Sequence, residues 1–349
     1  GDDLGPNTVT FTATDTAGNT ASAEATVTVG DLIPPVAVVQ DIEVFLDANG
    51  GATITAADLD AGSSDNAGIE SFTASQTVFG PGDLGENDVT FTVSDASGNT
   101  ASATATVTVG DLEAPSVDPG QTFAYQENGG VGDLLCTVTA SDNAGVAGFS
   151  IVSGDPSGLF AIDETGAITL TAAGASGAAN DFETAPNGFT LGIQAVDIAG
   201  NPGSADVVLS VTDIDEAPEI ALPGDVETEE DTPVTIVGLA VSDGDGDRLS
   251  VTLSANAGAE IALGTVAGLT VADGDGTDGT LALEGALADL NAALPGLVYR
   301  PASNATAPGA IEVTATDPDG LSAEETLAIG VIPVNDAPAI DDNALDALN

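Results

Sequence analysis

The chain has 349 residues, which is too long for one β-sandwich and enough for three or four of about 100 residues each. Its 56 Asp and Glu residues face only two cations, Arg248 and Arg300, so the formal net charge is −54. Such a polyanion repels phosphate groups, which excludes nucleic acids and acidic membrane surfaces as partners. With no His, no Met and one Cys, the chain also lacks the ligands of haem and soft-metal sites and the imidazole of serine or cysteine catalysis. What remains is the chemistry of carboxylates and carbonyls, which bind hard cations and above all Ca²⁺.

The apolar composition predicts an all-β protein with several thin cores. Apolar residues make up 42% of the chain but aromatic residues only 3%, and short alternating runs are separated by 43 Gly and 18 Pro. No stretch approaches 18 consecutive apolar residues, so we expect no membrane insertion. Paired carboxylates can hydrolyse glycosides. However, the chain has no Trp and only two Tyr to stack on a sugar, and we expect it not to be an enzyme.

A tandem repeat organises the first third of the chain. Residues 3–32 and 83–112 are nearly identical. The first copy has only the C-terminal part of the repeat, and half a sandwich cannot bury its hydrophobic face. Two alternatives follow: either the chain was cut from a longer one, or a second chain supplies the missing strands.

Each repeat ends in a strand with alternating apolar residues, such as 105–109, followed by an acidic residue and a proline. These markers are one sandwich apart, and the acidic links are too short and proline-rich to be loose tethers. The pattern therefore predicts tandem β-sandwiches in a linear array. The predicted domains are 1–32, 33–113, 114–217 and 218–338, with 339–349 as the start of the next linker or domain.

Further elements follow from local periodicity. Residues 134–138 read as a strand that buries Cys136, and residues 189–193 read as another strand. One helix is predicted over 283–294, because its leucines fall on one face and Pro295 follows.

Three segments carry a resemblance in the second predicted domain: LDANGGATITAADLDAGSSDNAGI (46–69), GENDVTFTVSDASGN (85–99) and VTVGDLEAP (107–115). Through them, residues 36–113 resemble the bacterial form of the hyalin repeat, an immunoglobulin-like module. The resemblance implies that residues 1–32 are the C-terminal part of another such repeat.

Four segments in the third predicted domain resemble a cadherin domain: TASDNAG (139–145), LFAIDETGAITL (159–170), AVDIAGN (195–201) and VTDIDEAP (211–218). In that family the equivalent acidic residues bind calcium at the junction with the following domain. The residues that the resemblance assigns to this role are Glu127, Asp181, Glu183, Asp213 and Asp215, with Glu216 at the place of the usual Asp.

The fourth predicted domain carries EEDTPVTI (229–236), VSDGDGDRLSVT (241–252), ATDPDGLSA (315–323) and IPVNDAPAI (332–340). Residues 219–338 thereby resemble the cadherin-like repeat of large bacterial surface adhesins. Together the resemblances imply the extender region of an adhesin of the RTX or Bap type: an extracellular, calcium-dependent protein at the bacterial cell surface.

The spacing of the acidic residues points to the same chemistry. Side chains at i and i+2 of a strand share one side, so an acid-x-acid pair presents both carboxylates together. Gathering anions costs about 1 kcal/mol per pair even in a water-like dielectric, and Ca²⁺ reverses that penalty by accepting six to eight oxygens. The pairs are Asp181/Glu183, Asp213/Asp215, Asp243/Asp245 and Asp317/Asp319.

Asp15, Asp95 and Asp197 each begin an Asp-x-x-Gly-Asn motif. Two interpretations remain open: a tight turn in which the aspartate accepts backbone N–H groups, or a calcium ligand at a domain junction. The other candidate ligands stand in the acidic links and in the motifs above: Asp31, Asp65, Asp111, Glu113, Asp142, Glu229 and Asp336.

Three functions are compatible with these features. The first is a calcium-stiffened stalk that projects the binding tip of an adhesin for cell adhesion or biofilm attachment, with neighbouring domains of the same chain as partners. The second is a subunit of an extracellular filament, sheath or surface layer, in which the half repeat docks into another copy by strand addition. The third, adhesion by these domains themselves, has no aromatic-rich patch to support it.

Overall fold

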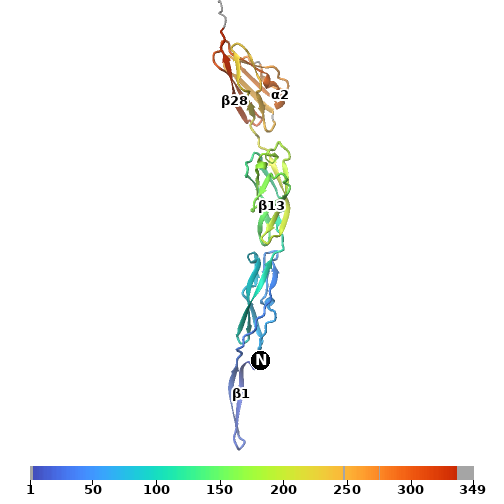
Figure 1. The fold of residues 1–349 in the computed structure, drawn as a ribbon, viewed down its shortest axis with the longest axis vertical. Helices are drawn as coiled ribbons and strands as arrows, with labels where there is room; N and C mark the ends of the chain where they lie inside the picture. The colour runs from blue at the N-terminus through green and yellow to red at the C-terminus, as the bar shows by residue number, and fades with distance from the viewer. Residues whose placement is uncertain (1–2, 247, 275, 336–349) are drawn as a thin grey trace, which may run out of the picture. The chain divides into compact units, whose positions relative to one another are not determined.

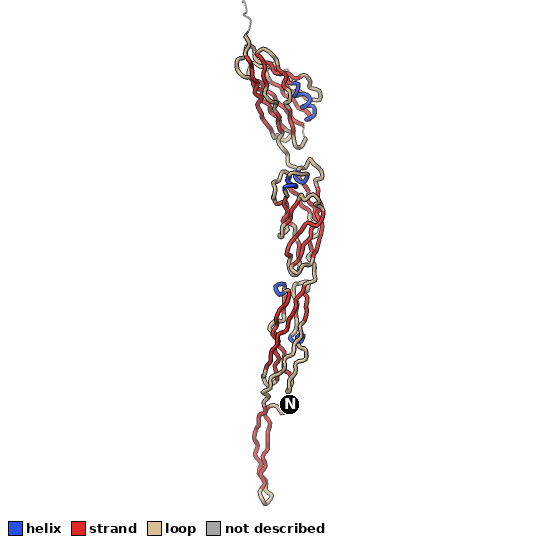
Figure 2. Tube along the Cα trace, viewed as in Figure 1, coloured by secondary structure: helices blue, strands red, loops and turns tan. Residues whose placement is uncertain are grey.

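The computed structural model describes residues 3–246, 248–274 and 276–335 (Figure 1). The chain divides into two compact units, Gly1–Thr212 and Asp213–Asn349, and each is described by itself. Strands dominate both units, as Figure 2 shows, and helices are few and short. The predicted all-β class with tandem β-sandwiches is therefore confirmed. No helix in the described part of the chain has the length and apolar character that crossing a membrane requires.

The first unit begins with a two-stranded hairpin, β1 (Gly5–Thr14) and β2 (Thr20–Val29), whose strands pair only with each other among the described residues. A sandwich follows, with one sheet in the order β3-β8-β7-β5 and a smaller sheet of β4 and β6. Its elements are β3 (Ile42–Phe45), β4 (Ala52–Thr53), η1 (Ala56–Leu59), β5 (Ile69–Ala74), β6 (Val78–Phe79), η2 (Pro81–Asp83), β7 (Gly85–Asp95) and β8 (Thr100–Gly110).

A second sandwich completes this unit, with sheets in the orders β10-β17-β16-β13 and β11-β15-β14, and a short pair of β9 and β12. Gly203, near the start of the last strand, lies so close to the Pro115 carbonyl that an added Cβ would be 1.7 Å from its oxygen, so the link before this sandwich packs tightly on it. The elements are β9 (Ser116–Val117), β10 (Thr122–Gln126), β11 (Leu134–Thr137), β12 (Ala140–Ser141), β13 (Val146–Ser153), β14 (Phe160–Ile162), β15 (Ala167–Leu170), α1 (Ala172–Ala175), η3 (Ala178–Asn180), β16 (Gly188–Asp197) and β17 (Pro202–Thr212).

The second unit is a sandwich with a large sheet, β19-β28-β27-β22-β25-β24, and smaller sheets β20-β26-β23 and β18-β21. Its elements are β18 (Glu219–Ala221), β19 (Val226–Glu229), β20 (Val234–Ile236), β21 (Ala240–Ser242), β22 (Arg248–Ala255), β23 (Glu260–Leu263), β24 (Thr270–Asp273), β25 (Thr280–Ala286), α2 (Leu287–Ala293), η4 (Leu294–Gly296), β26 (Leu297–Arg300), β27 (Gly309–Thr316) and β28 (Ser322–Ile332).

The predicted helix over 283–294 is wrong at its start. Residues 283–286 continue β25, where Leu281 and Leu283 point into the core with the period of two that a strand requires. The helix begins only at Leu287 and ends at Ala293, where η4 takes over with Pro295 in its first turn.

Each sandwich has its own apolar core, and the cores of the first unit meet through one residue. Ala144, in the second sandwich, is buried in the cluster that also holds Leu46, Phe79 and Phe91 of the first sandwich. Nearby, an added Cβ at Gly50 would lie 2.4 Å from the carbonyl oxygen of Asn143. The two sandwiches of the first unit are thus joined by direct packing as well as by the chain.

Cys136 lies in β11 and is buried in the core of the second sandwich. Burial raises the pKa of its thiol from 9.0 to about 11. Because the unfolded thiol ionises first, the stabilisation from burying the neutral thiol is full below pH 9 and is lost as the pH rises toward 11. We expect Cys136 in the native chain to react slowly with Ellman's reagent at pH 8 and to react at once in urea. Rapid reaction of the native chain would contradict this burial.

Candidate metal centres

The Asp-x-x-Gly-Asn turns place a carboxylate at the end of a long strand. Asp95, the last residue of β7, accepts hydrogen bonds through Oδ1 from Ser97 N (2.9 Å) and Asn99 N (2.8 Å) and through Oδ2 from Asn99 Nδ2 (2.7 Å). Gly98 has φ +90°, which suits glycine. Burial raises the pKa of Asp95, but the bonds from the side chain and backbone of Asn99 outweigh it and hold that pKa below 3.8. The carboxylate is therefore ionised at neutral pH although the residue is fully buried.

The same turn is built at the other two motifs. Asp197 accepts from Asn201 N (2.8 Å) and Asn201 Nδ2 (2.7 Å), and Asp15 accepts from Asn19 in the same way. The turn interpretation holds for all three residues. Two of them, Asp95 and Asp197, also lie within acidic clusters, so for these the two interpretations are not alternatives.

Two loops with the sequence Ser-Asp-Asn-Ala-Gly, 64–68 and 141–145, supply the next carboxylates. Asp65 Oδ1 accepts from Ala67 N (2.7 Å), and Asp142 Oδ1 accepts from Ala144 N (2.8 Å). These bonds fix one oxygen of each side chain on its own loop. The other oxygen of each, Oδ2, is buried and has no hydrogen-bond partner.

The third carboxylate of each set comes from the acidic link between domains. Asp31 Oδ1 accepts from Ile33 N (3.0 Å), and Asp111 Oδ1 accepts from Glu113 N (3.1 Å). The asparagine of the neighbouring Ser-Asp-Asn loop also donates to each of them: Asn66 to Asp31 (3.1 Å) and Asn143 to Asp111 (3.1 Å). Both link residues are buried.

These residues meet in two matching clusters in the first unit. The first cluster is Asp31, Asp65 and Asp95, and the second cluster is Asp111, Asp142 and Asp197; in each, one carboxylate oxygen per residue lies within 4.8 Å of the others. In the second cluster, Asp111 Oδ2, Asp142 Oδ2 and the neighbouring Asn143 Oδ1 are all buried without a hydrogen-bond partner. Asp111 itself is only 6% exposed. Buried oxygens of this kind are rare in proteins unless something binds them.

No basic side chain neutralises these clusters. The only two cations of the chain both lie in the second unit, where Arg248 pairs with Glu284 (3.8 Å) and Arg300 with Glu260 (3.7 Å). All four side chains are more than half exposed, so these ion pairs add little stability. Two carboxylates 4 Å apart repel by about 1 kcal/mol in water and about 4 kcal/mol at an effective dielectric constant of 20. A bound cation would remove that cost, and an oxygen-only donor set fits Ca²⁺.

A third cluster, Glu127, Asp181 and Glu183, lies at the other end of the second sandwich. Glu127 directly follows β10, is only 3% exposed, and accepts through Oε2 from Phe182 N (2.6 Å). Asp181 is tied to Thr184, whose backbone N (3.0 Å) and Oγ1 (2.8 Å) both donate to it. Three of the five residues assigned by the cadherin resemblance are thus brought together in one loop region. The other two, Asp213 and Asp215, lie in the segment before β18 and belong to the second unit.

The second unit holds the remaining candidates near β21 and the β27–β28 turn. Asp245 Oδ2 accepts from the backbone N of Glu216 (2.9 Å), and Asp243 lies between β21 and Gly244. Asp317 is buried and accepts from Leu321 N (2.9 Å), while its Oδ2 is buried without a hydrogen-bond partner. Asp317 thus occupies the same position in the β27–β28 turn that Asp95 and Asp197 occupy in the β7–β8 and β16–β17 turns, because each accepts from the backbone N four residues later.

Two candidates occupy places other than the ones expected. Glu113 is exposed, and its backbone rather than its carboxylate makes the described contacts, because its N donates to Asp111 and its carbonyl accepts from Asn201 (3.2 Å). Glu229 is also exposed, whereas the next residue, Glu230, is buried and accepts from Val334 N. Asp336 lies outside the described residues.

Glu230, which sequence reasoning missed, holds the place in the second unit that Glu127 holds in the second sandwich. Each follows an edge strand that pairs in parallel with the last strand of its sandwich, and each donates its backbone N to that strand, Glu127 to Thr212 O (3.2 Å) and Glu230 to Ile332 O (3.0 Å). The parallel register identifies this pair of residues, and a single sequence does not reveal that register.

The asparagines of the motifs were missed as well. Asn99 Nδ2 donates to the Asp31 carbonyl (3.1 Å), and Asn201 Nδ2 donates to the Asp111 carbonyl (3.2 Å). Each therefore joins the turn at the end of a long strand to the link before its domain. The recurrence of asparagine four positions after the aspartate was the available signal.

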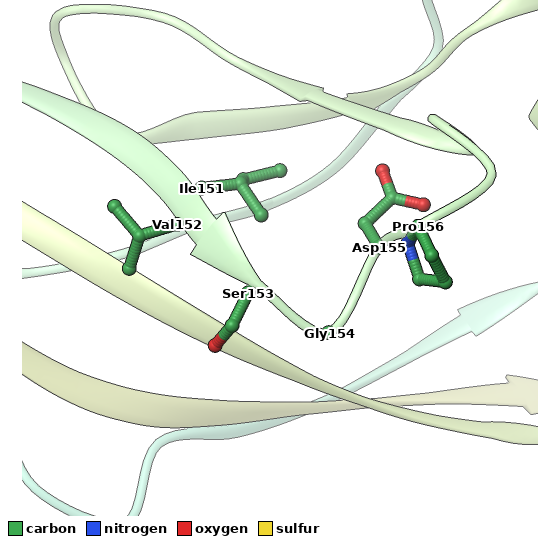
Figure 3. Close-up of a pocket in the computed structure, with 6 residues that line it drawn as sticks. All are labelled: Ile151, Val152, Ser153, Gly154, Asp155 and Pro156. Atoms are coloured by element: carbon green, nitrogen blue, oxygen red, sulfur yellow. The ribbon is translucent and has the colours of Figure 1, made fainter.

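A shallow pocket of about 410 Å³ at the end of β13 has no comparable chemistry (Figure 3). Asp155 is the one carboxylate among its lining residues, and it accepts from Leu159 N (2.8 Å) and Phe160 N (3.0 Å). Gly154 has φ +86°, and an added Cβ would lie 2.0 Å from the Thr190 carbonyl oxygen. These residues build a tight turn.

Comparison with known proteins finds sequence similarity to hyalin. The chain is 31% identical over 228 residues to hyalin of Strongylocentrotus purpuratus, which covers 62% of this chain and 17% of that protein. It is 29% identical over 233 residues to hyalin of Lytechinus variegatus, which covers 62% of this chain and 38% of that protein. The chain thus spans well under half the length of these relatives. The similarity supports the hyalin-repeat interpretation. No family model matches the chain.

Among solved structures, the chain is similar to several cadherin ectodomains. The protocadherin gamma-B4 extracellular domain matches with a TM-score of 0.34 and 19% identity, covering 95% of this chain and 56% of that one. Drosophila N-cadherin EC1–4 matches with a TM-score of 0.34 and 19% identity, covering 93% and 83%. Mouse cadherin-23 EC22–24 matches with a TM-score of 0.35 and 20% identity, covering 86% and 99%.

Proposed function

We propose that this chain is a calcium-stiffened extender segment of an extracellular adhesion protein. The observation that carries the proposal is the second cluster, where three carboxylates converge and three buried oxygens, on Asp111, Asp142 and Asn143, have no hydrogen-bond partner. The chain has only two basic side chains, and both pair with glutamates of the second unit, so a bound cation is the neutralising group that fits this site. The similarity to hyalin supports the adhesion role.

Calcium would act here as a clamp between successive sandwiches. Asp111 belongs to the link, whereas Asp142 and Asp197 belong to the sandwich that follows it. An ion shared by all three would fix the link against that sandwich. At the same junction, Ala144 packs into the core of the preceding sandwich and Gly50 lies against the Asn143 carbonyl. These contacts would then hold the preceding sandwich in place.

The first cluster would bind an ion by the same arrangement, and the third cluster by Glu127, Asp181 and Glu183. Calcium suits these sites better than magnesium, because they offer several carboxylates on loops rather than one or two around a hydrated ion. The partners in this function are the neighbouring domains of the same chain, and the charge of −54 argues against nucleic acid. The resemblance of residues 219–338 to bacterial adhesin repeats supports a location at the bacterial cell surface and a role in biofilm attachment.

Calcium binding and small-angle X-ray scattering of the same sample test the proposal. We expect equilibrium dialysis to show saturable Ca²⁺ binding that Mg²⁺ displaces poorly. We expect EDTA to broaden the distribution of interatomic distances, because the freed links then sample more conformations. A scattering profile that stays the same after the bound calcium has been removed would refute the stiffening role.

A further inference from the structure

A hydroxyl, an amide and a carboxylate meet near the start of the second sandwich, outside the acidic clusters. Residues 118–121, with the sequence Asp-Pro-Gly-Gln, turn the chain from β9 into β10. Gly120 has φ +72°, the conformation that a type II turn requires after its proline. The turn brings the side chains of Asp118 and Gln121 to a common neighbour, Thr139, which lies between β11 and β12.

The side-chain amide of Gln121 is held in place at both of its polar atoms. Its Oε1 accepts from Thr139 N (3.0 Å), and its Nε2 donates to the carbonyls of Thr139 (3.0 Å) and Asp118 (3.1 Å). The backbone N–H on Oε1 would stabilise negative charge on this oxygen if a nucleophile attacked the amide carbon.

The hydroxyl of Thr139 has the matching orientation. Its Oγ1 lies 2.6 Å from Asp118 Oδ2 and 3.1 Å from Gln121 Oε1. A hydroxyl has only one proton to donate, and the closer carboxylate is the stronger acceptor. Oγ1 therefore directs a lone pair, rather than its proton, toward the amide group of Gln121. A hydroxyl whose proton rests on a base beside a carbonyl group is an activated nucleophile.

The first sandwich has a glutamine at the equivalent position. Gln40 stands two residues before Ile42, the first residue of β3, which pairs in parallel with the last strand of its sandwich. Its Nε2 donates to the Asp58 carbonyl (2.9 Å), and among the described residues it has neither a hydroxyl nor a carboxylate as a partner. A backbone hydrogen bond thus serves to hold a glutamine at this position, and the hydroxyl and carboxylate at Gln121 are additions to it.

We propose that Thr139 and Gln121 join in an intramolecular ester. Thr139 Oγ1 attacks Cδ of Gln121 while Asp118 takes the hydroxyl proton, acting as a general base. The Oγ1–Cδ bond forms, the Cδ–Nε2 bond breaks, and Asp118 returns the proton to Nε2, so that ammonia leaves. Asp118 and Thr139 are both exposed, which gives the ammonia a direct path into water.

The ester would fasten the segment where the chain enters the second sandwich. The first strand there, β9, pairs with β12 through only two residue pairs, Ala140↔Val117 and Ser141↔Ser116. A covalent bond between the segments that directly follow β9 and precede β12 holds them together even when these few hydrogen bonds break. This bond forms without a metal ion and does not depend on the calcium proposal.

Intact-mass spectrometry of the purified full chain, incubated at neutral pH, tests the ester. We expect a mass lower than that of the sequence by one ammonia molecule. After denaturation and digestion with a Glu-specific protease, which cuts at Glu127, the peptides that hold Gln121 and Thr139 should be recovered as one linked species. Mild base should separate the two peptides and leave a glutamate in place of Gln121.

Variants of the three residues identify the reacting groups. Thr139→Val should keep the full mass, and Thr139→Ser should still lose ammonia. Asp118→Asn, which keeps the size of the side chain, should form the ester at least about tenfold more slowly, because the base is gone. Thr137→Val is the matched control, since it removes an exposed hydroxyl from neighbouring β11, and it should lose ammonia like the unaltered chain.

Two results would overturn the proposal. One is a full mass for the unaltered chain. The other is a loss of ammonia that persists in Thr139→Val, because it would place the reaction at another amide, such as the Asn49-Gly50 pair.

Discussion

Replacing Asp142 with asparagine is expected to change the stability of the second sandwich in opposite directions with and without calcium. In EDTA the variant should be more stable than the unaltered chain by about 1 kcal/mol or more, because one of three mutually repelling carboxylates is gone. The new amide can also donate to the buried oxygen of Asp111 that has no partner. In calcium the variant should be less stable, because a saturating ion at 100 times its Kd contributes about 2.7 kcal/mol and most of that is lost.

Hydrogen exchange of the amides in β16 and β17 measures this effect where it arises, since a chain of several sandwiches does not unfold in one step. Asp163→Asn is the matched control: Asp163 lies in the same sandwich, accepts similar turn hydrogen bonds from Thr165 and Ala167, and is exposed outside every cluster. We expect that variant to cost the same in calcium and in EDTA. If Asp142→Asn behaved like Asp163→Asn, the second cluster would not be a calcium site.

Removing calcium is expected to open the link between the sandwiches of the first unit to proteolysis. The backbone at Glu113 is held on both sides, since its N donates to Asp111 and its carbonyl accepts from Asn201. When the ion leaves, repulsion within the second cluster should loosen these contacts, and a Glu-specific serine protease should cut after Glu113 many times faster. We expect the same at Glu216, in the link 213–218.

Glu164 serves as the internal reference, because it lies in an exposed turn of the same sandwich and should be cut at the same rate in both conditions. Adding NaCl instead of calcium separates binding from screening, since monovalent salt shortens the range of the repulsion without joining the carboxylates. Equal cleavage after Glu113 with and without calcium would show that packing alone holds the link.

Sequence patterns predicted the fold class because alternation, turn residues and repeats are local signals. They also marked Asp65 and Asp142 through the Ser-Asp-Asn loops, and Asp95 and Asp197 through the Gly-Asn turns. The patterns did not show that a link residue, a loop residue and a turn residue meet in one cluster. That meeting depends on sheet order and on which loops share an end of the sandwich.

Two features that the sequence did not predict correctly, the buried Glu230 and the start of the helix, also depend on tertiary contacts. The sequence alone does not separate Glu229, the last residue of β19, from Glu230, which follows it, because only the pairing of β19 with β28 decides which of the two side chains is buried. The sequence predicts a helix that starts four residues too early, because Leu283 and Leu287 fit a helical period, whereas burial of β25 in the sheet favours a strand up to Ala286. In both places tertiary contacts override a local pattern.

A crystal structure of the chain grown in calcium, with anomalous data, shows whether the second cluster holds an ion. We expect an anomalous peak between Asp111, Asp142 and Asp197, at about 2.3–2.6 Å from the buried oxygens that have no hydrogen-bond partner. A well-ordered link from Asp111 to Pro115 with no ion between those three carboxylates would contradict it.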